Sequence, residues 1–490
     1  MNTNTHLLPG RKAAPEQLGD VLILGLGKSG RAVAEYCCDL IGTRVRSLTI
    51  AAGDRNEKVV AFADACRETG ARVLFDTFTF DTHFDTCIAS PGISQFSRFY
   101  ENAASVSTEI MSEVEFAWRE SRADTSWVAI TGTNGKTTTT TLVYHILKTA
   151  GLHVAAVGNI GNTCIGAVKD DTADVYVAEV SSFQLASMID FAPNAAVLLN
   201  ITLDHIYWHM TLDAYIEAKK QVFANLDKTH GTLVIDAVND TTRACVRDLK
   251  AQADRGFDYI PLGTKDGLHT SMVDACGSDA AAWIKDGMLC VTYKGETVDL
   301  IAEADLQIKG EHNASNALAA ASAALSMGVD PAKIREGLLT FKPLEHRLEP
   351  CGTVAGVQCF NDSKATNVDA TLKALESFPL AKPIFLLGGH DKGTDLAELV
   401  ASAEQHCRCV VCFGAAGQRF MDAFAQSSLV HIQAEHMEDA LDAALGMSQA
   451  GDIVVLSPAC ASFDEFDSFE HRGLVFKHLV EFRAATCTQG

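Results

Sequence analysis

The sequence predicts an α/β protein of three domains, each built around a parallel β-sheet. Short apolar segments rich in β-branched residues alternate along the chain with longer segments that have a helical apolar period, which is the pattern of strands and helices in such sheets. Glycine-rich or polar turns follow several of the predicted strands. A length of 490 residues fits about three domains at roughly 150 residues each.

The domain boundaries are placed at polar connecting segments. We expect a Rossmann-like domain over residues 1–119, a central P-loop ATPase-type domain with a parallel sheet over residues 120–343, and a second Rossmann-like domain over residues 344–490. The first boundary separates a predicted helix over 108–119 from the polar segment 120–125. The second lies in residues 342–350, which we interpret as an interdomain link.

Composition and charge narrow the class of protein. A hydrophobic content of 47% with 21% charged residues is typical of a globular protein with a substantial core. The formal net charge of −22 argues against broad binding to nucleic acid or anionic membranes, because phosphate groups require a basic face. Residues 1–20 lack the apolar segment of a signal peptide, and no apolar run is long enough to span a membrane. We therefore expect a cytoplasmic protein, and we expect a monomer.

The cysteines are expected to be reduced thiols in the domain cores. Cys407, Cys409 and Cys412 are closely spaced, but they lie in a strand-like segment in which successive side chains face opposite ways. The paired Cys and His spacing of zinc sites is also missing. Core thiols are therefore favoured over a metal site.

The clearest functional signal is Gly132-Thr-Asn-Gly-Lys-Thr-Thr138, which lies between a predicted strand (126–130) and a predicted helix (136–150). A glycine-rich turn that opens a helix directs backbone N–H groups to one place, beside the positive end of the helix dipole, and this suits phosphate. Lys136 adds a mobile cation, and the Thr137 hydroxyl can bind a phosphate-bound Mg²⁺. The segment is interpreted as a nucleoside triphosphate site.

A second glycine-rich turn lies near the N-terminus. Residues 21–30 predict a strand that runs into Gly25-x-Gly27-x-x-Gly30, which is typical of a dinucleotide-binding turn. An NAD site should have an acidic residue at the end of the second strand, but the strand predicted over 47–52 ends without one and Asp54 follows later. A related use of the turn is therefore favoured over NAD binding.

Two predicted strands of the central domain end in polar side chains. Glu179 ends the strand predicted over 175–180, where a carboxylate beside the phosphate loop is well placed to bind Mg²⁺. His205 follows the strand predicted over 195–199. A lone histidine is more often structural than a ligand. His205, however, follows a strand in register with Glu179 and the phosphate loop, so the two interpretations have equal weight.

Lys219 is an anomaly in the helix predicted over 212–226. The helix has an apolar stripe, and Lys219 falls in the middle of it at helical spacing. An ammonium group on a buried face is costly unless it is paired or chemically changed. The alternative is a lysine at the rim of the stripe whose charge reaches solvent.

Polar groups also gather at a helix start and in three loops of the last domain. His312, Asn313 and Asn316 lie at the start of a long Ala-rich helix, where they either cap the helix or serve a site.

Three polar loops follow predicted strands of the last domain and should face one crevice. They span residues 361–367, 388–393 and 457–462.

Together, these motifs resemble the Mur ligase family over about residues 22–476. The resemblance is carried by Gly132 to Thr138, Glu345-His-Arg347, and the segments 361–367 and 457–469. It implies an ATP-dependent ligase of peptidoglycan precursor synthesis that joins D-glutamate to the L-alanine carboxylate of UDP-N-acetylmuramoyl-L-alanine through an acyl phosphate. It also implies ATP and Mg²⁺ as cofactors.

The resemblance further implies a role for individual residues. The catalytic residues are Lys136, Glu179, His205 and Lys219, and the metal ligands are Thr137, Glu179, His205 and a Lys219 carbamylated by CO₂. The ATP-binding set is Gly132, Thr133, Asn134, Gly135, Lys136, Thr137, Thr138, Asn313, Asn316 and Arg347. The UDP-precursor set is Gly27, Ser29, Gly92, Asn159 and Ser181, and the D-glutamate set is Lys364, Thr366, Lys392, Ser462 and Phe469.

Two other classes of function fit part of the sequence. One is a related ligase, either a folylpolyglutamate synthase or a Mur ligase that adds another amino acid. The complete first domain disfavours the folate enzyme, and residues 457–469 favour D-glutamate over a diamino acid. The other is an NAD-dependent oxidoreductase or a nucleotide-binding regulator, which leaves Lys136, Glu179 and Lys219 unexplained.

Overall fold

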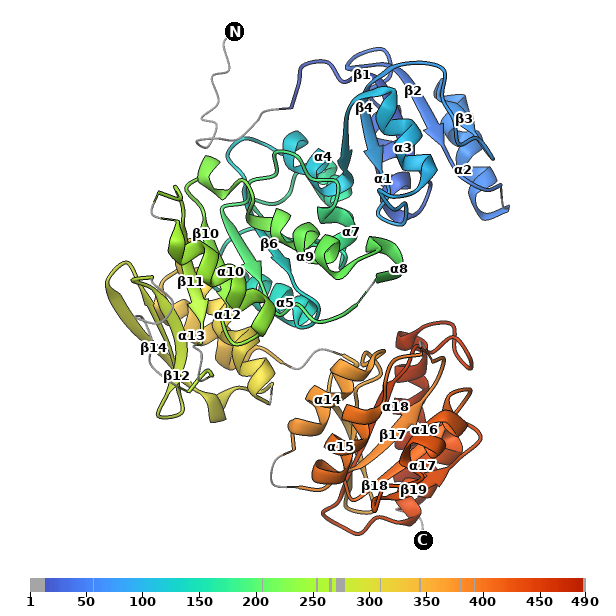
Figure 1. The fold of residues 1–490 in the computed structure, drawn as a ribbon, viewed down its shortest axis with the longest axis vertical. Helices are drawn as coiled ribbons and strands as arrows, with labels where there is room; N and C mark the ends of the chain where they lie inside the picture. The colour runs from blue at the N-terminus through green and yellow to red at the C-terminus, as the bar shows by residue number, and fades with distance from the viewer. Residues whose placement is uncertain are drawn as a thin grey trace. The chain divides into compact units, whose positions relative to one another are not determined.

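The computed structural model contains three β-sheets in two compact units. It describes residues 14–55, 57–204, 206–252, 254–263, 267–269, 278–308, 310–342, 345–378, 381–391 and 393–487. One unit comprises Met1–Leu306 and Ser315–Thr340, and the other comprises Gln307–Ala314 and Phe341–Gly490. The sheets can be followed by colour along the chain in Figure 1. They confirm the predicted α/β fold class, whereas the exact domain boundaries remain predictions.

The first sheet is parallel throughout its described strands and has the order β3-β2-β1-β4-β5. Its strands are β1 (Gly19–Leu24), β2 (Val45–Ala51), β3 (Arg72–Leu74), β4 (Phe84–Ala89) and β5 (Ser107–Ser112), and its helices are α1 (Lys28–Cys38), α2 (Glu57–Glu68), α3 (Arg98–Ser105) and α4 (Glu113–Glu120). The strand order reverses between β1 and β4, and ligands of open α/β sheets bind at such a point.

The predicted helix over 108–119 is wrong in its first half. Residues Ser107–Ser112 form β5, which pairs with β4 in parallel, and the helix α4 begins only at Glu113. Ser112 then caps α4, because its side chain accepts a hydrogen bond from the Glu115 N–H. Pairing with β4 decides the conformation, and a neighbouring strand is invisible to helical periodicity in the sequence.

Nine strands of the described chain form the central sheet, in the order β14-β13-β12-β11-β10-β9-β6-β8-β7. They are β6 (Ser126–Thr131), β7 (Val154–Gly158), β8 (Val175–Glu179), β9 (Ala195–Leu198), β10 (Thr232–Asp236), β11 (Asp258–Leu262), β12 (Ala281–Lys285), β13 (Met288–Tyr293) and β14 (Glu296–Ala302). The sheet is parallel from β7 to β12, as predicted, but β13 and β14 extend it as an antiparallel ribbon.

Helices cover the central sheet and connect its strands. They are α5 (Lys136–Thr149), α6 (Cys164–Asp170), α7 (Ser182–Leu185), α8 (Ile206–His209), α9 (Leu212–Lys220), α10 (Asp240–Ala251), α12 (Glu311–Ser326) and α13 (Pro331–Thr340). The helix predicted over 212–226 is too long, because α9 ends at Lys220 and 3-10 turns follow it. Helix α5 packs on α13, β7 and β8, which fixes the helix that begins at the phosphate loop.

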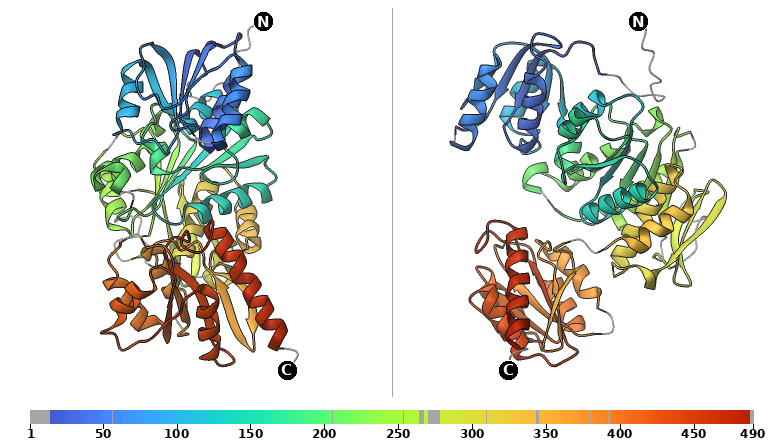
Figure 2. Two further views of the ribbon diagram at one scale, coloured as in Figure 1. Left: turned by 90° about the vertical axis from the view of Figure 1, so that its right-hand side faces the viewer. Right: turned by 180° about the vertical axis from the view of Figure 1, so that it is seen from behind.

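The third sheet has the order β15-β16-β20-β17-β18-β19, with only the β15–β16 pair antiparallel among its described strands. Its elements are β15 (Glu349–Val354), β16 (Val357–Asn361), β17 (Ile384–Gly388), β18 (Cys409–Phe413), β19 (Val430–Gln433), β20 (Ile453–Ala459), α14 (Val368–Glu376), α15 (Ala397–His406), α16 (Gly417–Phe424), α17 (Met437–Gly446) and α18 (Phe469–Cys487). Helix α18 lies along β15 and β16, as Figure 2 shows.

Cys409 and Cys412 lie in β18 and pack into core clusters on opposite faces of the third sheet. The cysteines whose side chains are described are free thiols. Across the described chain, no helix has both the length and the apolar character needed to cross a bilayer.

Candidate active site

The phosphate loop connects β6 to α5. Neighbouring atoms leave no room for a side chain at its two glycines. Gly135 has a φ of +84° and precedes the first residue of α5. A Cβ on Gly135 would lie 2.4 Å from the Asn316 Oδ1, and one on Gly132 would lie 2.6 Å from the Leu199 Cβ. The N-cap residue, Gly135, has no side chain that could cap α5, so the first N–H groups of the helix are available to an anion.

Asn200, which follows β9, holds the loop in this conformation. Its carbonyl accepts a hydrogen bond from the Thr133 N–H at 2.7 Å, and its Oδ1 accepts one from the Asn134 N–H at 3.0 Å. The Tyr215 hydroxyl lies 2.9 Å from the Thr133 Oγ1. Neighbouring elements therefore fix the loop backbone, and a preformed loop binds phosphate without paying for its own ordering.

Two lysine side chains converge on one carbonyl of the loop. The Lys136 Nζ donates to the Gly132 oxygen at 2.9 Å and to the Thr133 oxygen at 2.7 Å. The Lys219 Nζ, from α9, donates to the same Gly132 oxygen at 2.7 Å and lies 4.7 Å from the centroid of the Tyr215 ring. Two positive charges this close repel each other, so a ligand with negative charge would stabilise the pair.

Lys219 is buried, with an exposed fraction of 2%, so its charge does not reach solvent. Burial lowers the pKa of Lys219 well below its ordinary value of 10.5, and the Lys136 charge lowers it further. Asp204 and Glu179 act in the opposite direction. The sequence left open whether Lys219 lies at the rim of the apolar stripe or is buried, and the structure shows that it is buried.

Glu179 ends β8 directly beside the strand that leads into the phosphate loop, where it pairs with Ile130 of β6. Its side chain is 1% exposed. The Oε1 accepts a hydrogen bond from the Asn159 Nδ2 at 2.7 Å, whereas the Oε2 is buried without a hydrogen-bond partner among the described residues. A buried carboxylate oxygen of this kind is costly unless a cation binds it.

The residues around Glu179 fit a bound Mg²⁺. Oxygen atoms are the ligands that this ion prefers, and the unpartnered Oε2 is such an atom. Thr137, at the second position of α5, supplies the hydroxyl expected of a phosphate loop. His205, predicted as a further ligand, lies outside the described residues.

A cavity of about 700 Å³ lies at the carboxyl ends of the first sheet. Gly27, Ser29 and Gly92, which the sequence assigns to one binding site, all line it. Beside this cavity, the Lys28 Nζ donates to the Gly161 carbonyl at 2.7 Å, which ties the first glycine-rich turn to the loop after β7. A cavity of this size is within the range that holds small organic ligands.

In the second unit, the three polar loops come together at the carboxyl ends of β16, β20 and β17. The Ser457 Oγ donates to the Asp362 Oδ2 at 2.7 Å, and the His390 N–H donates to the Ala461 oxygen at 2.8 Å. Burial raises the pKa of Asp362 to about 7. The loops therefore lie in contact with one another, as predicted, whereas a crevice between them stays a prediction.

Arg472 holds these loops together from α18. Its side chain is 0% exposed; the Nε donates to the Ser363 Oγ at 2.9 Å and the Nη1 donates to the Cys460 oxygen at 3.1 Å. Burial lowers the pKa of Arg472 to about 10. A guanidinium group with several fixed donors suits this role.

Known proteins are similar to this chain over almost its whole length. Residues 130–324 match the family model "Mur ligase middle domain", and residues 346–460 match "Mur ligase, glutamate ligase domain". The UDP-N-acetylmuramoylalanine--D-glutamate ligase of Salinibacter ruber is 37% identical over 471 residues, which cover 94% of this chain and 97% of that protein. The protein of the same name from Latilactobacillus sakei is 35% identical over 479 residues, or 96% of this chain and 99% of that protein.

The chain belongs to the Mur ligase family.

Solved structures of Mur ligases share the fold. UDP-N-acetylmuramate-alanine ligase MurC from Thermotoga maritima has a TM-score of 0.55 at 18% identity, covering 95% of this chain and 99% of its own. MurF ligase from the same organism, in complex with ADP, has a TM-score of 0.57 at 16% identity, covering 90% of this chain and 96% of its own. At these identities the likeness concerns the fold alone.

Within this Mur ligase, the predicted ATP-binding residues fall in both units. The loop residues and Asn316 belong to the first unit, where the Thr139 Oγ1 donates to the Asn316 Oδ1 at 3.3 Å. Asn313 and Arg347 belong to the second unit. There, burial lowers the pKa of His312 to about 4, and the charges of Lys373 and Arg347 add to this effect.

Two of the predicted precursor-binding residues lie apart from the first-domain cavity. Asn159 contacts Glu179 through both its side chain and its backbone N–H, which donates to the Glu179 oxygen at 2.9 Å. Ser181 caps α7, because its Oγ accepts a hydrogen bond from the Gln184 N–H at 3.3 Å. Whether either touches the precursor stays a prediction.

The predicted D-glutamate residues are only partly brought together. The Lys364 Nζ lies 3.7 Å from the centroid of the Phe469 ring, and the Thr366 N–H donates to the Lys364 oxygen at 2.8 Å. Ser462 is buried in the loop after β20. Lys392 lies outside the described residues.

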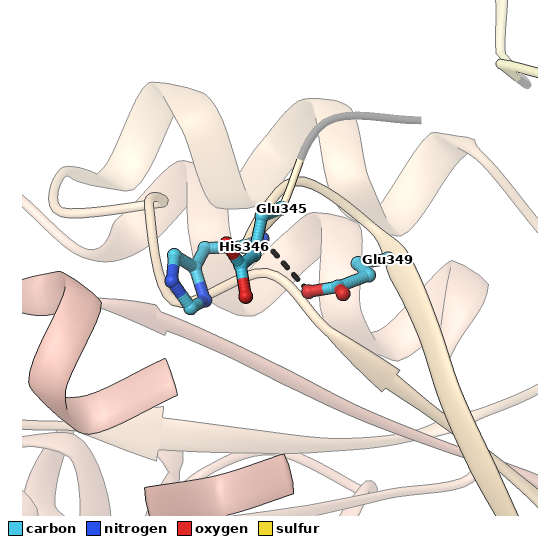
Figure 3. A group of neighbouring side chains, drawn as sticks. All are labelled: Glu345, His346 and Glu349. Carbon is cyan, nitrogen blue, oxygen red and sulfur yellow. Dashed lines mark hydrogen bonds between the residues drawn. The ribbon is translucent and has the colours of Figure 1, made fainter. Parts of the chain in front are cut away.

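Glu345, His346 and Glu349 (Figure 3) have potential metal-ligand atoms within 4.8 Å of one another. However, the Lys477 Nζ donates to the Glu345 Oε1 at 2.9 Å and to the Glu349 Oε1 at 2.7 Å. The dashed line in Figure 3 is the His346 backbone N–H donating to the Glu349 Oε2 at 2.9 Å. An ammonium group thus already bridges the two carboxylates, and we interpret the cluster as structural support for the segment that carries Arg347.

Sequence reasoning missed Asn200 and Arg472. Asn200 lies two residues after the last residue of β9. The signal that identified Glu179, a polar residue close to the end of a strand, therefore also applied to Asn200. Arg472 lies between Phe469 and Phe476 at helical spacing, which is the same anomaly of a cation in an apolar stripe that identified Lys219.

Proposed function

We propose that this Mur ligase adds D-glutamate to UDP-N-acetylmuramoyl-L-alanine with the consumption of ATP, as a step of cytoplasmic peptidoglycan precursor synthesis. The observation that carries the proposal is the similarity to UDP-N-acetylmuramoylalanine--D-glutamate ligases, which spans 94% of the chain at 37% identity in one case. The phosphate loop, two convergent lysines and a buried carboxylate supply the groups that such a ligation requires.

ATP binds with its phosphates on the loop between β6 and α5 in this proposal. The N–H groups at the start of α5 would hold the phosphate oxygens. Lys136 now donates to two loop carbonyls, and it would exchange these for the phosphate charge because charge-assisted hydrogen bonds are stronger than neutral ones.

Thr137 and Glu179 would hold Mg²⁺, with His205 as an expected third ligand. When bound, the ion would neutralise charge on the transferring phosphoryl group. The support is the buried Oε2 of Glu179, which has no hydrogen-bond partner among the described residues. The Asn159 amide donates to the other oxygen of this carboxylate, and a contact of this kind orients a metal ligand.

Lys219 becomes a carbamate in this proposal. Its lowered pKa makes a neutral amine available, and the nitrogen lone pair attacks CO₂ to form a C–N bond while a proton leaves to solvent. The product is an anion. It removes the repulsion between Lys219 and Lys136, and it adds a negatively charged oxygen ligand beside Glu179.

The reaction itself proceeds in two transfers. A carboxylate oxygen of the L-alanine group attacks the terminal phosphorus of ATP, the bond to ADP breaks, and an acyl phosphate forms. The amine of D-glutamate then attacks the carbonyl carbon, phosphate leaves, and the amine loses a proton to give the amide. Lys136 stabilises charge in the first transfer, while Lys364, Thr366 and Ser462 would hold the D-glutamate carboxylates and leave its amine free.

The proposal is tested by measuring phosphate release with a panel of amino acids. Release should require ATP, UDP-N-acetylmuramoyl-L-alanine and D-glutamate together. The panel should include L-glutamate, L-lysine and meso-diaminopimelate. Efficient use of a diamino acid would instead make the chain a Mur ligase of another step, and release without the UDP precursor would refute the proposal.

A further inference from the structure

The first-domain cavity is lined by two chemically different groups of residues. One is the glycine-rich turn, where Gly27, Lys28 and Ser29 line the cavity at the start of α1. The other is aromatic, because Phe78 and Phe99 also line the cavity. A nucleoside diphosphate has two parts that match these groups, an anionic diphosphate and a flat base.

Phe78 is a cavity residue with an exposed aromatic ring. Its exposed fraction is 44%, so the ring is open to a ligand in the cavity. The segment that carries it is fixed, since the Asn102 Nδ2 of α3 donates to the Phe78 oxygen at 2.8 Å. The ring is thus held at the cavity wall by a backbone contact and is not covered there.

Phe78 packs on Phe99, and Phe99 packs on Phe80. The Phe78 and Phe99 rings are nearly perpendicular, with centroids 5.2 Å apart and planes at 80°. Phe99 in turn stacks on Phe80, with centroids 6.2 Å apart and planes at 25°. This arrangement is a favourable packing of aromatic rings, and it fixes the position of Phe78 before a ligand binds.

We propose that Phe78 stacks on the uracil base of the UDP-linked precursor and thereby contributes to the affinity for this substrate. The inference rests on the proposed function only in naming a UDP-linked molecule as the substrate. A base offers two flat faces that stack on aromatic side chains, and the glycine-rich turn that lines the same cavity suits the diphosphate. An aliphatic chain would also cover Phe78, but it would leave the N–H groups of the turn without an anion.

The experiment measures UDP binding to the full chain by calorimetry, without ATP or D-glutamate. Phe78→Ala should weaken UDP binding roughly 5- to 150-fold, the equivalent of about 1 to 3 kcal/mol per stacked base. Phe78→Tyr keeps a ring and should restore affinity. Phe96→Ala is the matched control, because Phe96 is 46% exposed in the same domain but does not line this cavity.

A second probe separates stacking from a general disturbance of the cavity. Inorganic pyrophosphate has no base, so Phe78→Ala should leave its affinity unchanged. In turnover, Phe78→Ala should raise the KM for the UDP precursor and leave kcat and the KM for ATP unchanged. Unchanged UDP affinity in Phe78→Ala, an equal loss of pyrophosphate affinity, or failure of Phe78→Tyr to restore UDP binding would overturn the inference.

These outcomes are independent of the proposed ligation. UDP calorimetry does not require D-glutamate or catalysis, so an absence of D-glutamate-dependent phosphate release would refute the proposed function while the stacking result stands. Conversely, normal ligation with unchanged UDP affinity in Phe78→Ala would refute only the role of Phe78.

Discussion

The contact between Asn159 and Glu179 gives the sharpest quantitative prediction for the metal-binding region. The Asn159 Nδ2 donates to the Glu179 Oε1 at 2.7 Å, and the other carboxylate oxygen is buried without a partner among the described residues. Asn159→Ala therefore removes the side-chain donor that orients this carboxylate.

The expected magnitude follows from the type of hydrogen bond that is lost. A hydrogen bond to a charged group contributes about 1.5 to 3 kcal/mol, and residues that orient a metal ligand typically affect metal affinity by about 10- to 100-fold. Asn159→Ala should thus raise the Mg²⁺ concentration for half-maximal phosphate release by roughly 10- to 100-fold. At saturating Mg²⁺, most of the activity should return.

The assay is a Mg²⁺ titration of ATP turnover at several precursor concentrations. Asn162→Ala, a change of the same size in the same loop, is the matched control and should titrate like the parent protein. Sequence resemblance instead assigns Asn159 to the UDP precursor. If Asn159→Ala raises the KM for the precursor and leaves the Mg²⁺ titration unchanged, the orientation of Glu179 by Asn159 is refuted.

Further predictions concern three other side chains. Lys136→Ala should lower ATP turnover by about 10²- to 10³-fold with an unchanged melting temperature; normal turnover would exclude the phosphate-loop assignment. Removal of CO₂ and bicarbonate should abolish activity because Lys219 would lose its carbamate, and their return should restore activity. Native mass spectrometry that shows an unmodified Lys219 amine in active protein would contradict carbamylation. Burial raises the pKa of Glu113 from 4.5 to about 7, so stability should fall as pH rises between these values. Glu113→Gln removes this loss and should raise the melting temperature at pH 8 but not at pH 4; equal shifts at both would refute the titration.

The phosphate loop and the buried lysine were predictable because each has a local signal. The glycine spacing before Lys136 specifies a turn at the start of a helix, and Gly135 adopts the left-handed conformation that such a turn requires. Lys219 was recognisable from helical spacing alone, and its burial confirms that part of the interpretation. Such features depend on residues close in sequence.

The features that sequence reasoning missed depend on partners far away in the chain. Residues 108–112 have a helical pattern, but pairing with β4 makes them a strand. The support of the phosphate loop by Asn200 joins residues 66 or 67 positions apart, and Arg472 reaches Ser363 across 109 positions. Periodicity does not report such contacts, because they arise only when the sheets are assembled.

Activation of the carboxylate is the central claim, and isotope transfer tests it most directly. UDP-N-acetylmuramoyl-L-alanine with ¹⁸O in its alanine carboxylate would be converted with ATP and D-glutamate, and the released phosphate would be examined by mass spectrometry. If the carboxylate attacks ATP and phosphate later leaves the carbonyl carbon, one ¹⁸O atom passes into the phosphate for each amide formed. Amide formation with unlabelled phosphate would contradict an acyl phosphate.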